Sequence, residues 1–245
     1  MIRVFHPIAE ERPSKLRIQG ERFHYLARVL RVGAGDSLQV FDGKGRTFAA
    51  RVLSIGTDEL ELELAPAQTA ARAPPVVLIQ GMPKGEKLDW ILQKGTELGV
   101  ASIAPVAMRH CVAKLRPPQV EQRRQRWQRI AEEAARQCGR ADVPRILPYQ
   151  PLSDAIRRLP PGTRLLVLDE RETSVRLGQG LASLGDTDAP LALIVGPEGG
   201  LHPSELRELL EAGGVSVSLG RRVLRTETAS LAALAVILHV TGDLG

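Results

Sequence analysis

Two glycine-bearing runs near the end of the chain combine residue types that could hold and transform a small molecule. One is Val195-Gly196-Pro197-Glu198-Gly199-Gly200, and the other runs from Leu219-Gly220 to Arg225-Thr226-Glu227-Thr228-Ala229. Each run follows an apolar segment typical of a buried strand, and each ends where a helix is expected to begin. Because glycine permits positive φ and close approach of backbone amides, such turns at the edge of an α/β sheet commonly bind ligands. The alternative is a pair of tight turns without a ligand.

Other glycine and lysine motifs do not match the known phosphate-binding patterns. The run 81–87 contains a lysine but lacks the GxxxxGK[ST] spacing of a P-loop. Gly178-Gln179-Gly180 is followed by Ser183 where GxGxxG requires glycine, and no strand directly precedes it. Neither a P-loop nor a Rossmann dinucleotide site is therefore expected.

The distribution of histidines and cysteines predicts no metal site. The five histidines are scattered, and neither Cys111 nor Cys138 has a CxxC partner. We expect both cysteines to act as small buried hydrophobes. Cys138 also lies between Arg136 and Arg140, which is the electropositive setting that a thiolate nucleophile would need. No GxSxG nucleophile elbow is present.

Length and composition indicate an ordinary globular protein. The 245 residues suffice for one large domain or for a small and a medium one, and 43% are hydrophobic. Two cysteines make no disulfide framework, which favours a reduced, cytoplasmic setting. The N-terminus lacks the apolar core of a signal peptide, and the longest apolar run, 229–238, is too short to span a bilayer. We expect no membrane partner.

Positive charge is concentrated in two regions. Residues 109–145 contain ten basic and four acidic residues, and residues 1–35 contain seven and three, while the whole chain has a net charge of +5. The rest of the chain is therefore acidic. This imbalance suggests a polyanionic partner, although solvated arginines on helix faces would give the same composition.

Residues 1–70 are predicted to form a small, barrel-like β domain. A strong turn signal at 42–45 separates two expected strands, and a short amphipathic helix is expected at 21–31. The expected strands cover 38–41, 47–55 and 60–64. The proline- and alanine-rich segment 65–75 is interpreted as a linker.

The remaining chain alternates strand and helix patterns, which predicts an α/β domain with a parallel sheet. Gly99 should end the first helix, and Thr226 is the expected N-cap of the last. The expected strands cover 76–79, 102–106, 165–168, 191–195 and 215–219, and the main helices cover 86–98, 117–138 and 226–239. The helix 117–138 has an expected buried stripe of Trp127, Ile130, Ala131, Ala134 and Cys138.

Several motifs, in order along the chain, resemble the RsmE-type methyltransferases of bacteria, members of the SPOUT (trefoil-knot) superfamily. The resemblance covers nearly the whole chain. The motifs are His24-Tyr25-Leu26-Ala27-Arg28-Val29-Leu30-Arg31, Val40-Phe41-Asp42-Gly43, Gln93–Val100, Arg126–Ile130, Glu133–Arg140 with Pro144, and the two glycine-bearing runs. One departure is Gly95, where the family often has alanine, and this glycine should weaken its helix slightly.

The resemblance implies a fold and a reaction. The fold would be a PUA-like RNA-binding β-barrel domain over 1–70 and a SPOUT α/β knotted methyltransferase domain over 71–245, working as a homodimer. The reaction would be methylation of N3 of a uridine in 16S (small-subunit) ribosomal RNA by S-adenosyl-L-methionine. The substrate would be the RNA itself or the assembled subunit.

The resemblance also implies site residues. The cofactor would lie among three loops, formed by Leu168, Ile194, Gly196, Pro197, Glu198, Gly199, Gly200, Leu219, Gly220, Leu224, Arg225, Thr226, Glu227 and Ala229. Arg225 would stabilise developing negative charge on the base or hold a phosphate, and Glu198 or Glu227 would orient Arg225 or take the proton. The alternative is that both acids are structural. The RNA contacts would come from Arg3, His24, Arg28, Arg31, Arg136 and Arg140.

Two other functions remain open from the sequence. One is a non-catalytic RNA-binding module that has kept the fold. The other is a SPOUT ribose 2′-O-methyltransferase, although the usual N-terminal Asn/Arg motif of its knotted domain is not evident in this chain.

Overall fold

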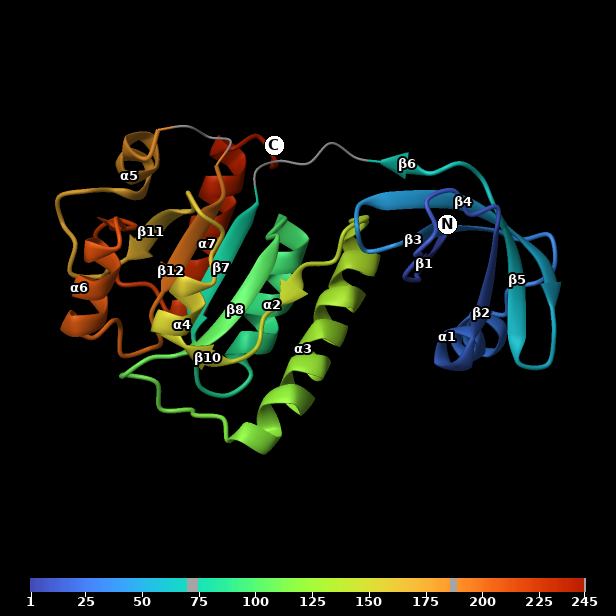
Figure 1. The fold of residues 1–245 in the computed structure, drawn as a ribbon, viewed down its shortest axis with the longest axis horizontal. Coiled ribbons are helices and arrows are strands. Elements are labelled where there is room, and N and C mark those ends of the chain that lie inside the picture. The colour runs from blue at the N-terminus through green and yellow to red at the C-terminus, as the bar shows by residue number, and fades with distance from the viewer. Residues whose placement is uncertain (70–74, 186–188, 245) are drawn as a thin grey trace. The chain divides into compact units, whose positions relative to one another are not determined.

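The chain folds into two compact units. The computed structural model describes residues 1–69, 75–185 and 189–244 (Figure 1). The N-terminal unit consists of Met1–Ala71 and Ala135–Val143, and the α/β unit consists of Arg72–Ala134 and Pro144–Gly245. Of the predicted linker 65–75, residues 70–74 lie outside the described residues.

The N-terminal unit is built on a small curled sheet. Its strand order is β1 (Ile2–Phe5), β3 (Ser37–Phe41), β4 (Arg46–Ile55), β5 (Glu59–Leu64) and β2 (Lys15–Gln19), and β6 (Gln68–Thr69) pairs with β4. Only the β1–β3 pair in this sheet is parallel among the described strands. Alternate side chains of β3, β4 and β5 enter one hydrophobic core. The three predicted strands and the small β domain are confirmed.

The predicted helix of this unit is shorter than expected, and its second half is wound as a π-helix. An α-helical turn, α1 (Gly20–His24), continues as the π-helix η1 (Tyr25–Val29). Phe23 and Leu26 are buried, as the amphipathic pattern predicts. The helix ends before residue 31 because Arg31 adopts a φ of +52°, a left-handed conformation that cannot continue it.

A return segment from the long helix completes the N-terminal unit. Ala135–Val143 comprises the last turn of α3 (Pro117–Cys138) and the residues after it. Gly45 N–H donates to the Ala141 carbonyl over 3.2 Å, and Val143 N–H donates to the Gly43 carbonyl over 3.0 Å. The predicted domain boundary at residue 70 does not include residues 135–143, where the chain returns to the N-terminal unit.

The α/β unit contains a parallel sheet, as the alternation of strands and helices predicts. The strand order is β10 (Gln150–Pro151), β8 (Ser102–Ala107), β7 (Val76–Gly81), β12 (Leu191–Val195), β11 (Arg164–Leu168) and β13 (Val215–Val217), and β9 (Arg145–Ile146) pairs with β8. Every residue of β7 and β12 is buried. Such continuous apolar strands require cover on both faces.

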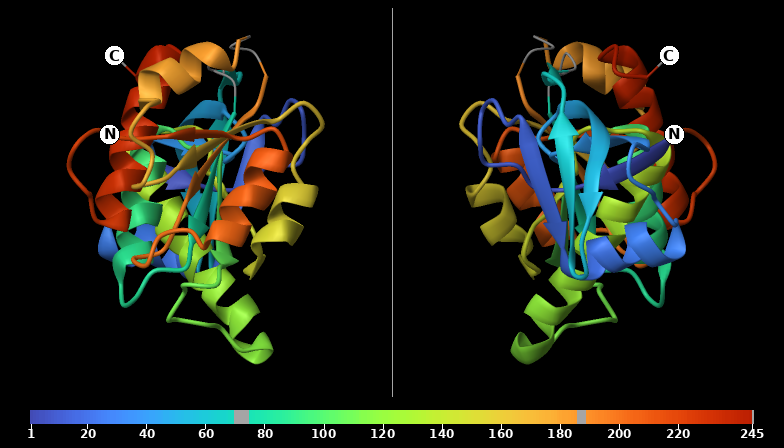
Figure 2. Two further views of the ribbon diagram at one scale, coloured as in Figure 1. Left: turned by 90° about the vertical axis from the view of Figure 1, so that its left-hand side faces the viewer. Right: turned by 90° about the vertical axis from the view of Figure 1, so that its right-hand side faces the viewer.

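Helices provide that cover on both faces of the sheet (Figure 2). On one face, α2 (Lys87–Leu98) packs against α7 (Thr226–Val240), and α7 also contacts β7 and β12. On the other face, α4 (Leu152–Arg157) packs on β8 and α6 (Pro203–Glu211) packs on β11. On the side of α7, α5 (Leu177–Ser183) contacts α7 and β13. Gly99 ends α2 with a φ of +122°, as predicted. None of the described helices is long and apolar enough to cross a membrane.

Two local expectations are wrong. The last predicted strand ends at Val217 because Ser218 begins a hydrogen-bonded turn with Gly220. Cys138 is exposed, although Trp127, Ala131 and Ala134 of the same predicted stripe are buried. Cys111 is buried as expected, and burial raises the pKa of its thiol.

The burial of β12 predicts a stability difference between two leucines. Leu193 is fully buried, whereas Leu210 on α6 is 44% exposed. We expect Leu193→Ala to lower the free energy of unfolding by about 2–5 kcal/mol through the cavity it leaves. Leu210→Ala should change it by less than about 0.5 kcal/mol. Urea denaturation followed by circular dichroism measures both, and equal losses would contradict this account of the core.

Candidate functional site

A pocket opens at the carboxyl ends of three neighbouring strands of the α/β unit. Its volume is about 430 Å³, within the usual range for small-molecule sites. The walls come from the segment after β11, the loop after β12, and the loop between β13 and α7, with Lys87 from α2. The carboxyl edge of a parallel sheet is where α/β proteins generally bind ligands.

Most of the predicted cofactor residues line this pocket. They are Leu168, Gly196, Pro197, Glu198, Gly200, Leu219, Gly220, Leu224, Arg225, Thr226 and Ala229. Three others lie beside it: Ile194 is fully buried in β12, Gly199 lies against His110, and Glu227 pairs with Lys87.

Nine further residues line the pocket without having been predicted. They are Lys87, Asp169, Glu170, Val195, Val217, Ser218, Arg221, Arg222 and Val223. Eight of them adjoin predicted positions or lie between them, so their place could be extrapolated from the same strand ends. Lys87 has no such signal, because it comes from a helix that begins 77 residues before β11.

The first glycine-bearing run forms a closed turn that requires glycine. Gly200 has a φ of +68°, and its N–H donates to the Pro197 carbonyl over 3.0 Å. A Cβ at Gly196 would lie 2.9 Å from the carbonyl carbon of Gly200. In the second run, Gly220 has a φ of +113°, and a Cβ there would meet no atom within 4 Å. Backbone groups of both runs can therefore approach a ligand closely.

A buried polar network joins the loop after β12 to the ends of β7 and α7. Thr226 Oγ1 donates to the Gly196 carbonyl over 2.7 Å and accepts from Gln80 Nε2 over 3.0 Å. Ser230 Oγ donates to Gln80 Oε1, and all three side chains are buried. Thr226 was expected to cap α7, but Arg225 is the N-cap residue because the Thr226 hydroxyl is used in this network.

Lys87 holds two carboxylates at the rim of the pocket. Its Nζ lies 2.9 Å from Glu198 Oε1 and 3.3 Å from Glu227 Oε2. The hydrogen bond to Glu198 is the main reason why the pKa of Lys87 is raised. Burial alone would raise the pKa of Glu198, but hydrogen bonds from Lys87 and from the Lys84 amide outweigh it, so the pKa is lowered. Both groups are therefore charged at neutral pH.

A second ion pair connects the segment after β11 to the loop after β12. Asp169 is buried, and its Oδ1 lies 3.0 Å from Arg171 Nε. The Arg171 guanidinium also donates to the Leu201 carbonyl over 3.3 Å. The hydrogen bond from Arg171 to Asp169 raises the pKa of the arginine. These contacts position two of the three pocket walls relative to each other.

Arg225 is the one predicted catalytic cation, and its side chain is available. It is exposed, it lines the pocket, and its backbone turns out of the loop into α7. In the described part of the chain, its guanidinium makes no hydrogen bond or ion pair. Within the described residues no ion pair joins Arg225 to Glu198 or Glu227, and both acids pair with Lys87.

All six predicted RNA-binding residues lie in the N-terminal unit. The return segment brings Arg136 and Arg140 to it from far along the chain. The Arg136 guanidinium lies 5.5 Å from the Tyr25 ring centroid, and Arg140 pairs with Asp142. Arg3 is largely committed to internal contacts with Gln39 and the Arg140 carbonyl, and burial lowers its pKa. His24, Arg28 and Arg31 are exposed.

No metal site is found among the residues that the structure describes. They contain no group of three or more histidine, cysteine or acidic side chains that could hold an ion. Two of the scattered histidines do meet, since the rings of His110 and His202 are 5.4 Å apart.

Comparison with known proteins identifies the family. A family model of the RNA methyltransferase domain matches residues 71–238, and a model of the RNA methyltransferase PUA domain matches residues 18–65. The ribosomal RNA small subunit methyltransferase E of Bacillus subtilis is 33% identical over 95% of this chain and 92% of its own length. This chain belongs to the methyltransferase E family.

Other members of the family are similar over most of their length. The methyltransferase E of Synechocystis is 35% identical over 88% of this chain and 70% of its own. The crystal structure of the Neisseria gonorrhoeae methyltransferase E, bound to S-adenosyl methionine, has a TM-score of 0.85 at 30% identity and covers 98% of both chains. The expected fold class, a PUA domain followed by an α/β methyltransferase domain, is confirmed. The trefoil knot stays a prediction.

The buried network predicts different effects for two threonines of α7. Thr226→Val keeps the shape of the side chain but removes the hydroxyl that donates to the Gly196 carbonyl and accepts from Gln80 Nε2. We expect it to lower the free energy of unfolding by about 1–3 kcal/mol. Thr228→Val, at an exposed position, should cost less than about 0.5 kcal/mol. Thermal denaturation compares the two, and equal stability would contradict the role given to the network.

Proposed function

We propose that this protein uses S-adenosyl-L-methionine to methylate N3 of a uridine in small-subunit ribosomal RNA. The observation that carries the proposal is the pocket between the two glycine-bearing runs, in a chain similar over its full length to a methyltransferase E with bound S-adenosyl methionine. The ribosomal RNA in the names of the relatives supports the substrate class.

The residues of the pocket fit a cofactor of this kind. Open space at Gly220 and the closed turn at Gly196–Gly200 leave backbone groups able to bond an adenine and an amino acid moiety. Leu168, Leu219 and Leu224 provide apolar walls between these polar groups. When bound, the cofactor supplies the reactive methyl group, so the chain contributes orientation and electrostatics.

We assign the electrostatic role to Arg225. Attack by uracil N3 on the methyl group requires loss of the N3 proton, which passes to solvent in this proposal, and negative charge then spreads over N3 and the adjacent carbonyl oxygens. As the N3–methyl bond forms, the methyl–sulfur bond breaks and leaves a neutral thioether. A guanidinium at the pocket stabilises that charge through charge-assisted hydrogen bonds. Arg225 is suited to this role because its side chain is exposed at the pocket and makes no ion pair within the described residues.

Glu198 is better suited to positioning than to proton uptake. Its lowered pKa makes it a weak base, and its Oε1 already accepts hydrogen bonds from Lys87 and from the Lys84 amide. Through these bonds it fixes the loop after β12 against the start of α2. Glu227 is not part of the pocket lining. In this proposal both acids support the site, and Arg225 acts on the base.

The N-terminal unit supplies the wider RNA contacts in this proposal. Arg28 is exposed on the π-helix and Arg31 just after it, and Arg136 and Arg140 belong to the same unit. Arginines hold phosphates through paired hydrogen bonds, so binding should weaken steeply with salt. We expect the protein to act in the cytoplasm, on free ribosomal RNA or on assembled subunits.

A homodimer is also part of the proposal. Trp90 on α2 and Val236 and Val240 on α7 leave apolar side chains exposed on two helices that pack together. Exposed apolar groups of this kind favour association with a second copy.

Replacement of Arg225 tests the catalytic assignment. We expect Arg225→Ala to bind S-adenosyl-L-methionine with little change in calorimetry but to methylate RNA roughly a hundredfold more slowly, as for loss of an oxyanion donor. Mass analysis of nucleosides from the methylated RNA gives the rate and distinguishes N3 from ribose methylation. A variant that methylates at the wild-type rate would refute the role of Arg225, and ribose products would refute the proposed reaction.

The role of Glu198 is tested by the pH dependence of Glu198→Gln. Because a lowered carboxyl pKa keeps Glu198 ionised above the acidic range, its titration should not shape the rate near neutrality. We expect a lower rate, but the same pH profile between about pH 6 and pH 9 as in the wild type. Disappearance of an acidic limb in the variant would show instead that Glu198 takes the proton.

A further inference from the structure

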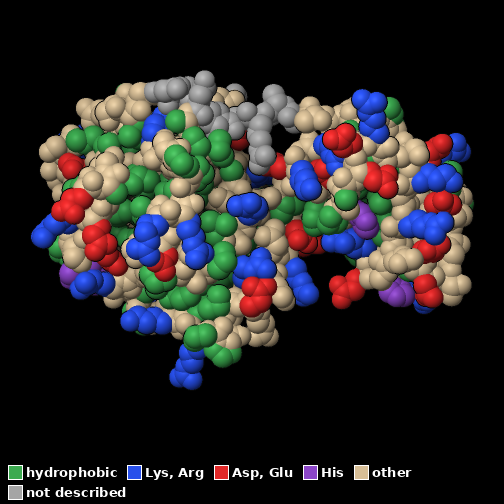
Figure 3. Space-filling model, in the orientation of Figure 1, with side chains coloured by type: hydrophobic (Ala, Val, Ile, Leu, Met, Phe, Trp, Pro, Cys, Tyr) green, Lys and Arg blue, Asp and Glu red, His purple; other side chains and the backbone are tan. Residues whose placement is uncertain are grey.

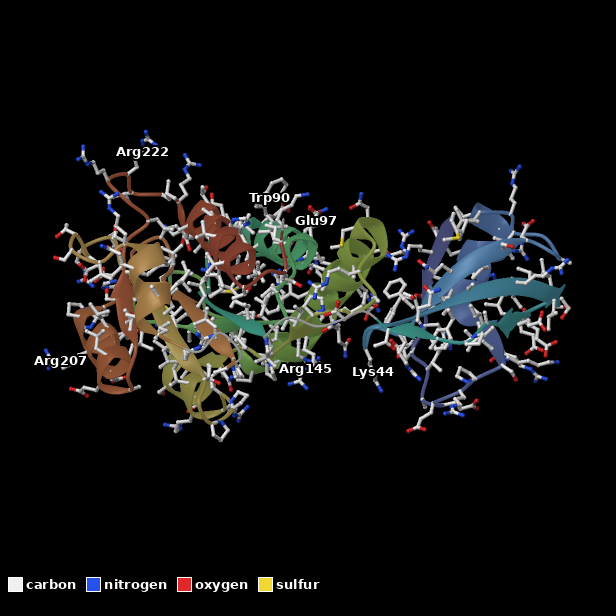
Figure 4. All side chains as sticks on the ribbon, turned by 90° about the horizontal axis from the view of Figure 1, so that it is seen from above. Lys44, Trp90, Glu97, Arg145, Arg207 and Arg222 are labelled. Carbon is white, nitrogen blue, oxygen red and sulfur yellow. The ribbon has the colours of Figure 1, made fainter. Side chains whose placement is uncertain are left out.

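The loop between β13 and α7 presents arginines that the proposed catalytic roles do not use. Arg221 and Arg222 are exposed and line the pocket together with Arg225. Val223, at the tip of the same loop, is 80% exposed. Figure 4 shows Arg222 extending outward from this loop. The loop thus has one side toward the pocket and arginines directed to solvent.

Both ends of the loop are anchored, so these side chains are held at the pocket mouth. At the start, Ser218 N–H donates to the Val175 carbonyl over 2.9 Å, and Ser218 Oγ accepts from Gly220 N–H over 3.0 Å. At the end, Thr226 is fixed by Gln80 and by the Gly196 carbonyl. The arginines between these anchors therefore remain at the rim of the site.

The acids around the pocket do not neutralise these arginines. Glu198 and Glu227 pair with Lys87, and Asp169 pairs with Arg171. Glu170, the other acid of the lining, forms no ion pair with Arg221 or Arg222 within the described residues. For Arg221 and Arg222 the described residues provide no ion pair or side-chain hydrogen bond. Three arginines within five positions repel one another, and an anion placed among them would relieve that repulsion.

On the face drawn in Figure 3, Lys and Arg side chains are spread over both units rather than gathered in one patch. The loop differs from that background because its arginines adjoin the pocket. Proximity to the reaction site, and not charge density alone, therefore distinguishes this group.

We propose that Arg221 and Arg222 hold the RNA backbone phosphates that flank the target base. The proposal rests on the function proposed above. A base that enters the pocket must leave its stack, which brings its neighbouring phosphates to the pocket mouth. Arginine binds phosphate oxygens through a planar pair of donors, and the exposed Val223 offers apolar contact to a ribose or base. The loop then contacts cofactor on one side and RNA on the other.

The salt dependence of RNA binding tests this surface. The probe is a fluorescein-labelled single-stranded RNA oligonucleotide containing one uridine, and fluorescence anisotropy gives Kd over a range of KCl concentrations. We expect Arg221→Gln/Arg222→Gln to raise Kd roughly tenfold at low salt. The slope of log K against log salt should become shallower by about 1.4, because two phosphate contacts are lost. Arg221→Lys/Arg222→Lys should keep most of the slope.

A matched control comes from two arginines elsewhere in the α/β unit. Arg145 on β9 and Arg207 on α6 are exposed, and Figure 4 shows both away from Arg222. Arg145→Gln/Arg207→Gln changes the net charge equally and should leave the slope near that of the wild type. A similar slope in both glutamine variants would overturn the proposal, because it would show a general effect of charge.

Three other results would also overturn the inference, and each can be told apart from failure of the proposed function. A wild-type slope with weakened S-adenosyl-L-methionine binding would place the arginines at the cofactor. A wild-type slope with altered sedimentation would place them at an interface between copies of the chain. A wild-type slope with neither change would show a solvated loop. The proposed function itself fails if the wild-type protein neither binds S-adenosyl-L-methionine nor methylates RNA.

Discussion

The pocket depends on the hydrogen bonds of one buried glutamine. Gln80 is fully buried, and its amide bonds Thr226 and Ser230 of α7 and the backbone carbonyl of Gly81. Thr226 in turn bonds the Gly196 carbonyl. A buried polar group without a partner costs about 1–3 kcal/mol, so all these bonds must form together. The network therefore sets the positions of the end of β7, the loop after β12 and the start of α7 in a single arrangement.

Close packing and two ion-pair groups extend this constraint around the pocket. A Cβ at Gly81 would lie 2.6 Å from Pro197 Cδ, so the end of β7 and the loop after β12 are in direct contact only because residue 81 is glycine. Lys87 binds the same loop and the first turn of α7 from the solvent side. Asp169 and Arg171 attach the segment after β11. Orientation is the larger part of catalysis by a bound methyl donor, and these contacts provide it.

Local sequence patterns were sufficient to predict the strands and turns, but they did not predict the contacts between residues far apart in the chain. Apolar runs predicted β12 and the core of β7, and glycines predicted the turns at Gly196–Gly200 and Gly220, because these depend on neighbouring residues. Gln80 and Lys87 carried no local signal, since their partners lie more than one hundred residues away. The same limit explains Thr226: its hydroxyl predicts a helix cap, but a distant carbonyl binds it. The return segment 135–143 continues the helical pattern of α3, so periodicity does not reveal that it joins the N-terminal unit.

The ion pairs of Lys87 and the unpaired state of Arg225 within the described residues depend on each other. Glu227 is two residues from Arg225 in the chain, and Glu198 lies in the opposite wall of the pocket. Free carboxylates in these positions would attract Arg225 and cancel the field that the reacting base needs. Lys87 prevents this, because a single ammonium takes both acids as partners. The raised pKa of Lys87 and the lowered pKa of Glu198 keep both members of that pair charged near neutral pH. A lysine outside both glycine-bearing runs thus takes both acids as partners, and this leaves Arg225 free for the role proposed for it.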